Sequence, residues 1–414
     1  MKDDNNYKVK SSCRVCGNDK LDKVLDLPKT PIGDAYLTTI DDNYDNLNCP
    51  VDMYYCNNCS LGQLIHVIDP ELLYHNFTYE TSVSLGLIEH FLEYAKEIDG
   101  IISINSNDYI LDIGSNDGSL LKAFKSMGYR VLGIDPAIEI ANKATQDGIE
   151  TISSLFSYKL SSEIKKNKGH PKIITSNNTM ANIDDLDEFA ISVKNLLHKD
   201  GLFVFETLCL EDILTKMYFD HIYHEHISYF SARSLKYYFN KYDLELLKLI
   251  KIDIKGGSYR GLVQHKGKAS KITSNIGLMI NKEDNPNQIS EKFNLLNNKL
   301  KTTKNELRSI VNNLLNDKKL IAGYGASVGS TTLIYYFELG EKLTCLVDDN
   351  KIKHEKYSPG FHLPVYDSDH LNKYNIDYTI IIAWRYSQEI INNNKKYLNN
   401  GGHFIIPFPS IKII

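Results

Sequence analysis

Short apolar runs alternate with amphipathic stretches along the chain, and the pattern is clearest at residues 109–136. Residues 109–113 and 130–134 are apolar runs of strand length, and the apolar residues at 120–124 repeat at helical spacing. A glycine-rich turn joins the first run to this helix. The order of strand, glycine loop, helix and strand predicts two neighbouring strands of an open, parallel α/β sheet.

The same alternation extends over the middle of the chain. A helix is predicted at residues 85–98, and later a strand at 173–175, a helix at 186–197 and a strand at 202–206. Strands that alternate with helices form doubly wound sheets. We therefore expect a Rossmann-like α/β domain at residues 76–285.

A second series of elements fills the C-terminal part of the chain. A polar, amphipathic helix is predicted at residues 288–316, followed by a strand at 319–322, a glycine loop at 323–327 and a helix at 330–337. Later strands are predicted at 343–347, 378–383 and 404–406, and a helix at 388–397. The order echoes the middle domain and predicts a second Rossmann-like domain at residues 286–414.

The N-terminal part is different, because residues 1–75 carry two C-x-x-C pairs, Cys13 with Cys16 and Cys56 with Cys59. Each pair presents two thiolates on a tight turn, and four thiolates suit a closed, tetrahedral and therefore structural Zn²⁺ site. The alternatives are four unrelated buried thiols and a nucleic-acid zinc finger, and against the latter acidic residues follow the first pair instead of a basic stripe.

Composition and charge narrow the class of protein. The 414 residues are 42% hydrophobic and 24% charged, which is ordinary for a soluble globular protein of two or three domains. The net charge of −5 gives no basic footprint for nucleic acid, and no apolar stretch reaches the ~20 residues that span a bilayer. The polar N-terminus has no signal-peptide core. We expect a cytoplasmic protein that binds neither nucleic acid nor membrane.

The loop after the first strand reads D-I-G-S-N-D-G and indicates its ligand. NAD(P) requires G-x-G-x-x-G, and Asp117 would repel its pyrophosphate, whereas carboxylates at Asp112 and Asp117 suit the cationic groups of S-adenosylmethionine. Asp135 would accept from the ribose hydroxyls. We therefore expect S-adenosylmethionine, with a dinucleotide or no ligand as alternatives. The expected cofactor residues are Asp112, Gly114, Ser115, Asn116, Asp117, Gly118, Asp135, Pro136, Asn177, Asn178 and Met180.

Residues 221–230 concentrate three histidines, one glutamate and two tyrosines. Histidine acts as a general base near neutral pH. A metal site would use His224 and His226, which share one face of an extended segment while Glu225 points away. A buried structural cluster would leave many polar atoms in need of partners. A catalytic base with orienting neighbours fits this composition best.

Two other segments carry groups that can face a ligand. Residues 74–84 contain several hydroxyls, including that of Tyr79, and they either close over a site or form a linker packed by its aromatic side chains. In residues 255–261, Ser258 and Arg260 either hold phosphate or sugar oxygens or lie in an exposed hairpin turn.

The C-terminal glycine loop either binds a nucleotide or is a repeat of the fold without a ligand. Two nucleotide-type clefts in one chain fit a cofactor in one and a nucleotide-activated substrate in the other. The residues expected to line the second cleft are Tyr324, Ser327, Asp348, Lys353, His354, His362 and Trp384.

Taken together, the order of motifs resembles the sugar C-methyltransferases that act on nucleotide-activated 4-ketodeoxysugars, over nearly the whole chain. The matching motifs are C-x-x-C…C-x-x-C, the Tyr/Ser segment at 74–84, D-I-G-S-N-D-G, S-N-N-T-M-A-N-I-D-D-L, Y-H-E-H, G-G-S-Y-R, G-Y-G-A-S and A-W-R. The resemblance implies S-adenosylmethionine in the middle domain and a dTDP- or GDP-linked sugar towards the C-terminal domain.

The resemblance also implies the roles of individual residues. His226 would be the base that removes the proton from C3, next to the 4-keto group, and Tyr223, Glu225 and Tyr79 would assist. Tyr223 or His224 would donate to the enolate oxygen. We expect a monomer or weak homodimer. The alternative functions are an NAD(P)-dependent nucleotide-sugar reductase or epimerase, an O- or N-methyltransferase, and a non-enzymatic zinc-containing interaction protein.

Overall fold

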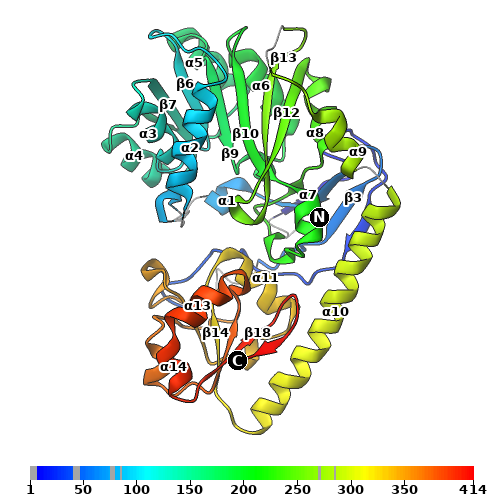
Figure 1. Ribbon diagram of the computed structural model, residues 1–414, viewed down its shortest axis with the longest axis vertical. Helices are drawn as coiled ribbons and strands as arrows, with labels where there is room; N and C mark the ends of the chain where they lie inside the picture. Colours follow the sequence, from blue (N-terminus) through cyan, green and yellow to red (C-terminus); the bar gives the residue numbers. More distant parts are fainter. Residues whose placement is uncertain (1–6, 41–46, 75–79, 84–85, 269–271, 284–285) are drawn as a thin grey trace, which may run out of the picture.

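The computed structural model describes residues 7–40, 47–74, 80–83, 86–268, 272–283 and 286–414. It is an α/β structure with two lobes (Figure 1). The upper lobe contains the N-terminal domain and the middle domain, and the lower lobe is the C-terminal domain. The fold class predicted from the sequence is therefore confirmed.

The N-terminal domain is built from short strands. Their bounds are β1 Tyr7–Val9, β2 Asp22–Leu25, β3 Met53–Cys56, β4 Leu61–Leu64 and β5 His66–Ile68. Strands β2 to β4 form an antiparallel sheet, and β1 pairs with β5. The sheet is completed by a strand from far along the sequence, β11 (Ser228–Tyr229), which pairs with β4 in the order β11-β4-β3-β2.

The middle domain contains a seven-stranded sheet in the order β12-β13-β10-β9-β6-β7-β8. Strands β10, β9, β6, β7 and β8 are parallel, and β13 and β12 extend the sheet as an antiparallel hairpin. The strands are β6 Tyr109–Ile113, β7 Arg130–Asp135, β8 Thr151–Ser153, β9 Ile173–Asn177, β10 Leu202–Leu208, β12 Leu244–Ile252 and β13 Ser258–His265. The wholly buried β6 and β10 are apolar along most of their length, as expected for strands covered on both faces.

Helices cover both faces of this sheet (Figure 1). Those of the upper lobe are α1 Pro70–Tyr74, α2 Leu87–Asp99, α3 Ser119–Ser126, α4 Ile138–Gln146, α5 Tyr158–Lys168, α6 Leu186–Leu196, α7 Leu210–Thr215, α8 Ala232–Lys241 and α9 Ile276–Glu283. The predicted helices at 85–98 and 186–197 agree with α2 and α6 to within two residues.

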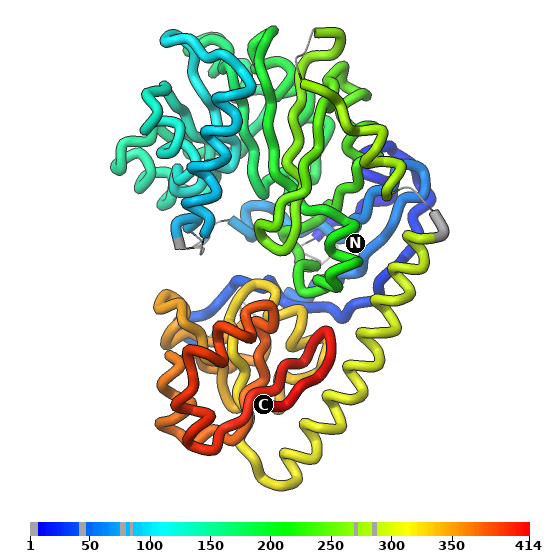
Figure 2. The backbone as a smooth tube through the Cα atoms, in the orientation of Figure 1, coloured from blue at the N-terminus to red at the C-terminus, as the bar shows by residue number. Residues whose placement is uncertain are grey.

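The long helix α10 (Pro286–Asn316) runs along one side of the molecule and joins the two lobes (Figure 2). The C-terminal sheet has the order β16-β15-β14-β17-β18-β19, parallel except for β19. Its strands are β14 Ile321–Tyr324, β15 Cys345–Val347, β16 Val365–Tyr366, β17 Tyr378–Ile381, β18 His403–Ile406 and β19 Lys412–Ile413. Its helices are α11 Val328–Tyr336, α12 His370–Lys373, α13 Ser387–Asn393 and α14 Lys395–Asn399. The single helix predicted at 388–397 is thus two, broken at Asn394.

The N-terminal chain passes between the lobes and connects them (Figure 2). Leu37 forms a β-bridge with Tyr357, and Thr331 donates a hydrogen bond to the Gly33 carbonyl. One hydrophobic core includes Leu25 and Val51 from the N-terminal domain together with residues of α10 and the C-terminal sheet. In the part of the chain that the structure describes, no helix is long and apolar enough to cross a membrane.

Candidate active site

A cleft of about 1020 Å³ lies where the three domains meet. Pockets for one small ligand measure about 300–1,000 Å³, so its size is at the upper end of that range and suits a cofactor beside a second molecule. Many of the residues predicted for the site line this cleft. They are Asp112, Gly114, Ser115, Asn116, Asp135, Pro136, Asn177, Asn178, Tyr223, Glu225, His226, Ser327, Asp348 and Lys353.

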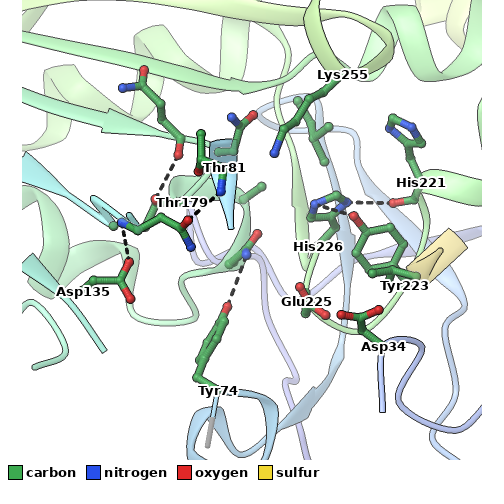
Figure 3. Close-up of a pocket in the computed structure, with 18 of the residues that line it drawn as sticks. Asp34, Tyr74, Thr81, Asp135, Thr179, His221, Tyr223, Glu225, His226 and Lys255 are labelled. Carbon is green, nitrogen blue, oxygen red and sulfur yellow. Dashed lines mark hydrogen bonds between the residues drawn. The ribbon is translucent and has the colours of Figure 1, made fainter. Parts of the chain in front are cut away.

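The cofactor side of the cleft is organised by Asp135 at the end of β7. Its carboxylate accepts hydrogen bonds from the backbone N–H of Asn116 (2.8 Å) and of Ala137 (2.9 Å). The side chain of Asn116 in turn accepts from the backbone N–H of Thr81, at 2.8 Å. Figure 3 shows Asp135 and Thr81 on the same side of the cleft. The glycine loop is therefore fixed between the second strand and the segment that precedes α2.

Gly114 permits close approach of the loop to the end of β9. Its φ is +76°, and a Cβ at this position would lie 2.2 Å from Oγ1 of Thr179. Nearby, the buried Oγ of Ser115 has no hydrogen-bond partner among the described residues, which leaves a polar atom for a ligand. With Asp135 placed to accept from ribose hydroxyls, these residues fit S-adenosylmethionine.

Two carboxylates of the glycine loop do not have the role expected from charge alone. Asp112 lines the cleft, but burial raises its pKa to about 7, while Oγ1 of Thr175 donates to it at 2.6 Å. Asp117 does not line the cleft, because it accepts from the backbone N–H of Ser119 and, at 2.8 Å, of Ser82. Asp117 therefore ties α3 to the segment before α2, and direct contact with the cofactor is not supported.

The histidine-rich segment forms a turn, so the extended geometry considered for the metal-site alternative does not apply. The backbone N–H of His226 donates to the Tyr223 carbonyl at 3.0 Å and closes the turn. Because of this turn, Tyr223, Glu225 and His226 all line the cleft, whereas His224 does not. Figure 3 shows the three cleft residues gathered on the side opposite Asp135.

Two hydrogen bonds define the state of the His226 imidazole. Nδ1 lies 3.0 Å from the His221 carbonyl, an acceptor, so Nδ1 carries the proton and Nε2 carries the lone pair. The Tyr223 hydroxyl donates to Nε2 at 3.0 Å. Burial lowers the pKa of His226 to about 4. The imidazole is therefore neutral at physiological pH and able to accept a proton.

Glu225 lies beside a carboxylate from the N-terminal domain. Burial, and then the charge of Asp34, raise the pKa of Glu225 to about 8. Asp34 is paired with Lys353 of the C-terminal domain at 2.5 Å. Figure 3 shows Glu225 and Asp34 side by side in the cleft. Glu225 is thus a protonated acid at neutral pH, which can donate a hydrogen bond.

Several predicted site residues lie outside the cleft and make contacts of their own. Nε2 of His224 contacts the Cys49 carbonyl at 3.0 Å, which corrects its assignment as an oxyanion donor. Arg260 is buried in an ionic cluster with Glu206 and Glu97, so it is not a substrate ligand. The other predicted residues that do not line the cleft are Gly118, Met180, Ser258, Tyr324, His354, His362 and Trp384.

For three of these residues, the side chain contacts a nearer partner. The hydroxyl of Tyr324 donates to Asp349 at 2.8 Å, and Nε2 of His354 contacts the Asp348 carbonyl at 2.7 Å. Trp384 packs against Tyr218, with ring centroids 5.6 Å apart. Tyr79 lies outside the described residues.

The cleft also contains residues that the sequence did not single out for the site. Asp34 comes from a loop that carries no motif, so no pattern pointed to it. Lys255 lines the cleft from the turn η4 (Ile254–Gly256), whereas the sequence had indicated Ser258 and Arg260 of the same segment. Arg385 of η7 (Trp384–Tyr386) pairs with Asp220 at 3.6 Å and reaches the cleft from the C-terminal domain.

The four cysteines of the N-terminal domain come together as predicted. The sulfur atoms of Cys13, Cys16, Cys56 and Cys59 all lie within 4.8 Å of one another, and two of the pairs are 3.5 Å apart. Four thiolates around Zn²⁺, with Zn–S bonds of about 2.3 Å, require sulfur separations of roughly 3.8 Å. The cluster therefore fits a closed, structural zinc site.

Replacing Gly114 by alanine is expected to weaken S-adenosylmethionine binding at least about tenfold, because the new methyl group would displace Thr179 and distort the loop. Isothermal titration calorimetry measures the change. Gly128→Ala is the matched control, since Gly128 also has a positive φ (+93°) but has no atom within 4 Å of the added Cβ. Equal losses of affinity in both variants would show that backbone strain, and not the Gly114 contact, is responsible.

Comparisons with known proteins agree with this geometry. Three family models match successive parts of the chain: a zinc binding domain at residues 13–74, a methyltransferase domain at 86–249 and a C-methyltransferase C-terminal domain at 253–409. The C-methyltransferase NovU of Streptomyces niveus is 31% identical over 404 residues, which cover 97% of this chain and 96% of NovU.

Solved structures resemble part of the chain. The PH0226 protein of Pyrococcus horikoshii OT3 is 15% identical with a TM-score of 0.37, over 47% of this chain and 98% of that one. A SAM-dependent methyltransferase of Anabaena variabilis is 18% identical with a TM-score of 0.35, over 47% and 91%. From the match to NovU along nearly its whole length, the chain belongs to the C-methyltransferase family and is an S-adenosylmethionine-dependent enzyme with a zinc-binding domain.

Proposed function

We propose that the protein transfers the methyl group of S-adenosylmethionine to C3 of a nucleotide-linked 4-ketodeoxysugar, through an enolate formed by His226. One observation carries the proposal: the turn with Tyr223, Glu225 and His226 faces the glycine loop across a cleft that the C-terminal domain also lines (Figure 3). The neutral imidazole of His226 thereby lies opposite the cofactor loop, with Nε2 hydrogen-bonded to Tyr223.

The C-terminal domain supports a nucleotide as the second ligand. The carboxylate of Asp348, which follows β15, accepts from the backbone N–H of Ala326 (2.6 Å) and of Asn350 (2.7 Å). Asp135 has the same relation to the glycine loop of the middle domain. In sheets of this kind, the carboxylate at that position accepts from ribose hydroxyls. Asp348 therefore offers a second nucleoside site that opens into the same cleft.

We infer that three cations of the cleft, two of which are paired with carboxylates, bind a diphosphate between the nucleoside and the sugar. Lys255 lines it from the middle domain, and Lys353 and Arg385 line it from the C-terminal domain. Lysine and arginine are the side chains that bind phosphate groups. These three cations replace Ser258 and Arg260 as the proposed diphosphate ligands.

The proposed reaction begins with removal of a proton from C3, which the neighbouring ketone makes acidic. Nε2 of His226 takes the proton, and the electron pair of the C–H bond moves into the enolate, whose oxygen accepts hydrogen bonds from Tyr223 and from protonated Glu225. To free Nε2, the Tyr223 hydroxyl turns from His226 to this oxygen. Preorganised donors of this kind are often the largest contribution to catalysis. Bound S-adenosylmethionine supplies an electrophilic methyl group on a cationic sulfur. His226 afterwards releases its proton to solvent.

The rate of proton exchange at C3 is expected to be nearly constant from about pH 5 to 7.5 and to fall above about pH 8. His226, whose pKa is lowered by burial to about 4, must be unprotonated and is so throughout this range. Glu225, whose pKa is raised by burial to about 8, must be protonated and loses its proton at the upper limit. Initial rates of solvent-deuterium incorporation measure this profile.

Glu225→Gln is the matched variant for the alkaline limit. The amide keeps a hydrogen-bond donor but does not titrate, so the decline above pH 8 should disappear. If the exchange rate of this variant still declines above pH 8, a group other than Glu225 is responsible for the decline. A rate that increases up to about pH 6.5, as for an ordinary histidine, would contradict a buried imidazole as the base.

The proposed function is tested by incubating the protein with S-adenosylmethionine and a panel of dTDP- and GDP-linked 4-ketodeoxysugars. A gain of one methyl group by mass, located at C3 by NMR, is expected for at least one member. Because C5 also adjoins the ketone, a methyl group found at C5 would support the enolate mechanism but contradict the assignment of C3. If every ketosugar remains unmethylated while cofactor binding is normal, the substrate class is wrong.

A further inference from the structure

The segment that carries His226 is built into the sheet of the N-terminal domain. Strand β11, which begins two residues after His226, is the edge strand of the zinc-domain sheet, with Ser228 opposite Gln63 and Tyr229 opposite Gly62. The hydroxyl of Tyr229 donates, at 3.2 Å, to the His221 carbonyl that also accepts from Nδ1 of His226.

Ile227, the residue that follows His226, is held from both sides. The N–H of Ile227 donates to the Ala181 carbonyl of the middle domain at 2.8 Å, and the Ile227 carbonyl accepts from the N–H of Leu64 at 3.0 Å. A third bond comes from Arg14, whose Nη1 donates to the same carbonyl at 3.1 Å. The backbone direction at His226 therefore depends on the zinc domain.

Arg14 is placed for this contact by the metal site itself. It lies between Cys13 and Cys16 in the first cysteine pair, and its side chain is fully buried. Nη1 also donates to the Leu64 carbonyl at 2.5 Å and to Oε1 of Gln63 at 3.3 Å. Nη2 has no hydrogen-bond partner among the described residues, so Nε and Nη1 alone fix the orientation of this buried guanidinium.

The other end of the guanidinium reaches the rim of the cleft. Nε donates to Oδ1 of Asp184 at 3.0 Å, and Asp184 lines the cleft. Although burial opposes it, Lys8 and Arg14 hold the pKa of Asp184 at about 2, so the pair stays ionised. The side chain of Arg14 thus connects the zinc-binding turn with strand β4, with Ile227 after His226, and with the edge of the cleft.

We propose that Arg14 is a positioning residue for His226, so that the zinc-binding turn sets the orientation of the catalytic base. The inference rests on the proposed function in taking His226 as that base. Zinc bound to Cys13 and Cys16 would fix the turn that carries Arg14. Arg14 and strand β4 together then fix the position of Ile227, which follows His226. The zinc-binding domain therefore contributes to proton transfer as well as to the stability of the protein.

The test is Arg14→Lys, which keeps the charge but cannot reach Ile227, Leu64 and Asp184 together. Displacement of a catalytic group by about 1 Å can cost about 10²-fold in rate, so deuterium exchange at the substrate carbon should fall about 10- to 100-fold. Zinc content and S-adenosylmethionine affinity should stay within about twofold. Amide hydrogen exchange of residues 221–230 should become faster at His226 and Ile227.

Lys10→Met is the matched control. The ammonium group of Lys10 also binds Asp184, at 3.0 Å, but unlike Arg14 it does not hydrogen-bond to Ile227 or Leu64. It should leave carbon exchange and amide exchange unchanged. If Arg14→Lys fails to fold, Gln63→Met, which removes one acceptor that aligns Arg14, should change both readouts in the same direction to a smaller degree.

The outcomes separate the two proposals. The positioning role is overturned if Arg14→Lys exchanges the carbon-bound proton at the wild-type rate. It is also overturned if Lys10→Met loses exchange to the same degree, or if Arg14→Lys loses cofactor affinity to the same degree as exchange. If the wild-type protein exchanges no ketosugar proton at all, the proposed function fails instead. Amide exchange at His226 and Ile227 then decides the role of Arg14 by itself, since unchanged protection would refute it.

Discussion

His226→Ala is expected to retain S-adenosylmethionine binding but to lose deuterium exchange at the substrate C3 by about 10²- to 10⁴-fold, the range that general bases contribute. His226 lies on the turn opposite the glycine loop and has no contact with Asp135 or Gly114, so the cofactor site should remain intact. Methylation should fall in parallel, because the enolate must form before the methyl group is transferred. NMR of the recovered sugar measures the exchange, and calorimetry measures cofactor affinity.

His224→Gln provides the comparison, since His224 is the neighbouring imidazole but lies outside the cleft. Its loss removes the contact with the Cys49 carbonyl and should lower the melting temperature, whereas the exchange rate of the folded protein should change little. Exchange that persists at the wild-type rate in His226→Ala would remove His226 from the role of base. A loss of exchange in His224→Gln, measured well below its melting temperature, would instead place His224 in the chemistry.

Cys56→Ser is expected to abolish zinc binding and to unfold the N-terminal domain, because a structural zinc site can supply about 10–16 kcal/mol of apparent binding energy. The damage should extend to the active site, since β11 is an edge strand of the sheet that the cysteines support. The zinc content measured by atomic emission, the melting temperature and the rate of deuterium exchange at C3 should therefore all decrease. The glycine loop of the middle domain does not belong to this sheet, so part of the cofactor affinity should remain.

Cys49→Ser is the control for this experiment. Cys49 is also buried in the N-terminal domain, but it is not among the four clustered cysteines. The substitution should leave zinc content unchanged and cost only the amount typical of a small buried change, about 1–3 kcal/mol. A Cys56→Ser protein that remains folded and active without zinc would contradict a structural role for the metal.

The sequence predicted the parts of the site that depend on local pattern. The loop at Gly114 to Gly118 follows a buried strand and precedes a helix, and Asp135 ends the next strand, because short-range periodicity and turn chemistry determine such units. The paired cysteines were equally clear, because two residues between thiols place both on one turn. Arg14 and Asp184, in contrast, are 170 residues apart, and no local pattern joins them.

The sequence failed where a side chain had a choice of partner. The imidazoles of His224 and His226 are two residues apart and look equivalent in the sequence, yet a turn closed at Tyr223 directs them to different domains. Likewise, Arg260 in the G-G-S-Y-R motif forms an ion pair with Glu206, which is buried on a neighbouring strand. Such choices depend on which acceptor lies nearest in space.

By itself, the sequence determined that this is a zinc-containing α/β methyltransferase with a nucleoside-type loop and a histidine-rich segment, since each of these features is encoded within a few tens of residues. Only the tertiary structure decided that His224 lies outside the cleft, that Asp34 and Lys353 adjoin Glu225, and that a strand of the middle domain completes the zinc-domain sheet. The reason is that such pairings are selected by the burial and hydrogen bonding of the whole fold, in which residues that are far apart in the chain compete for the same partners.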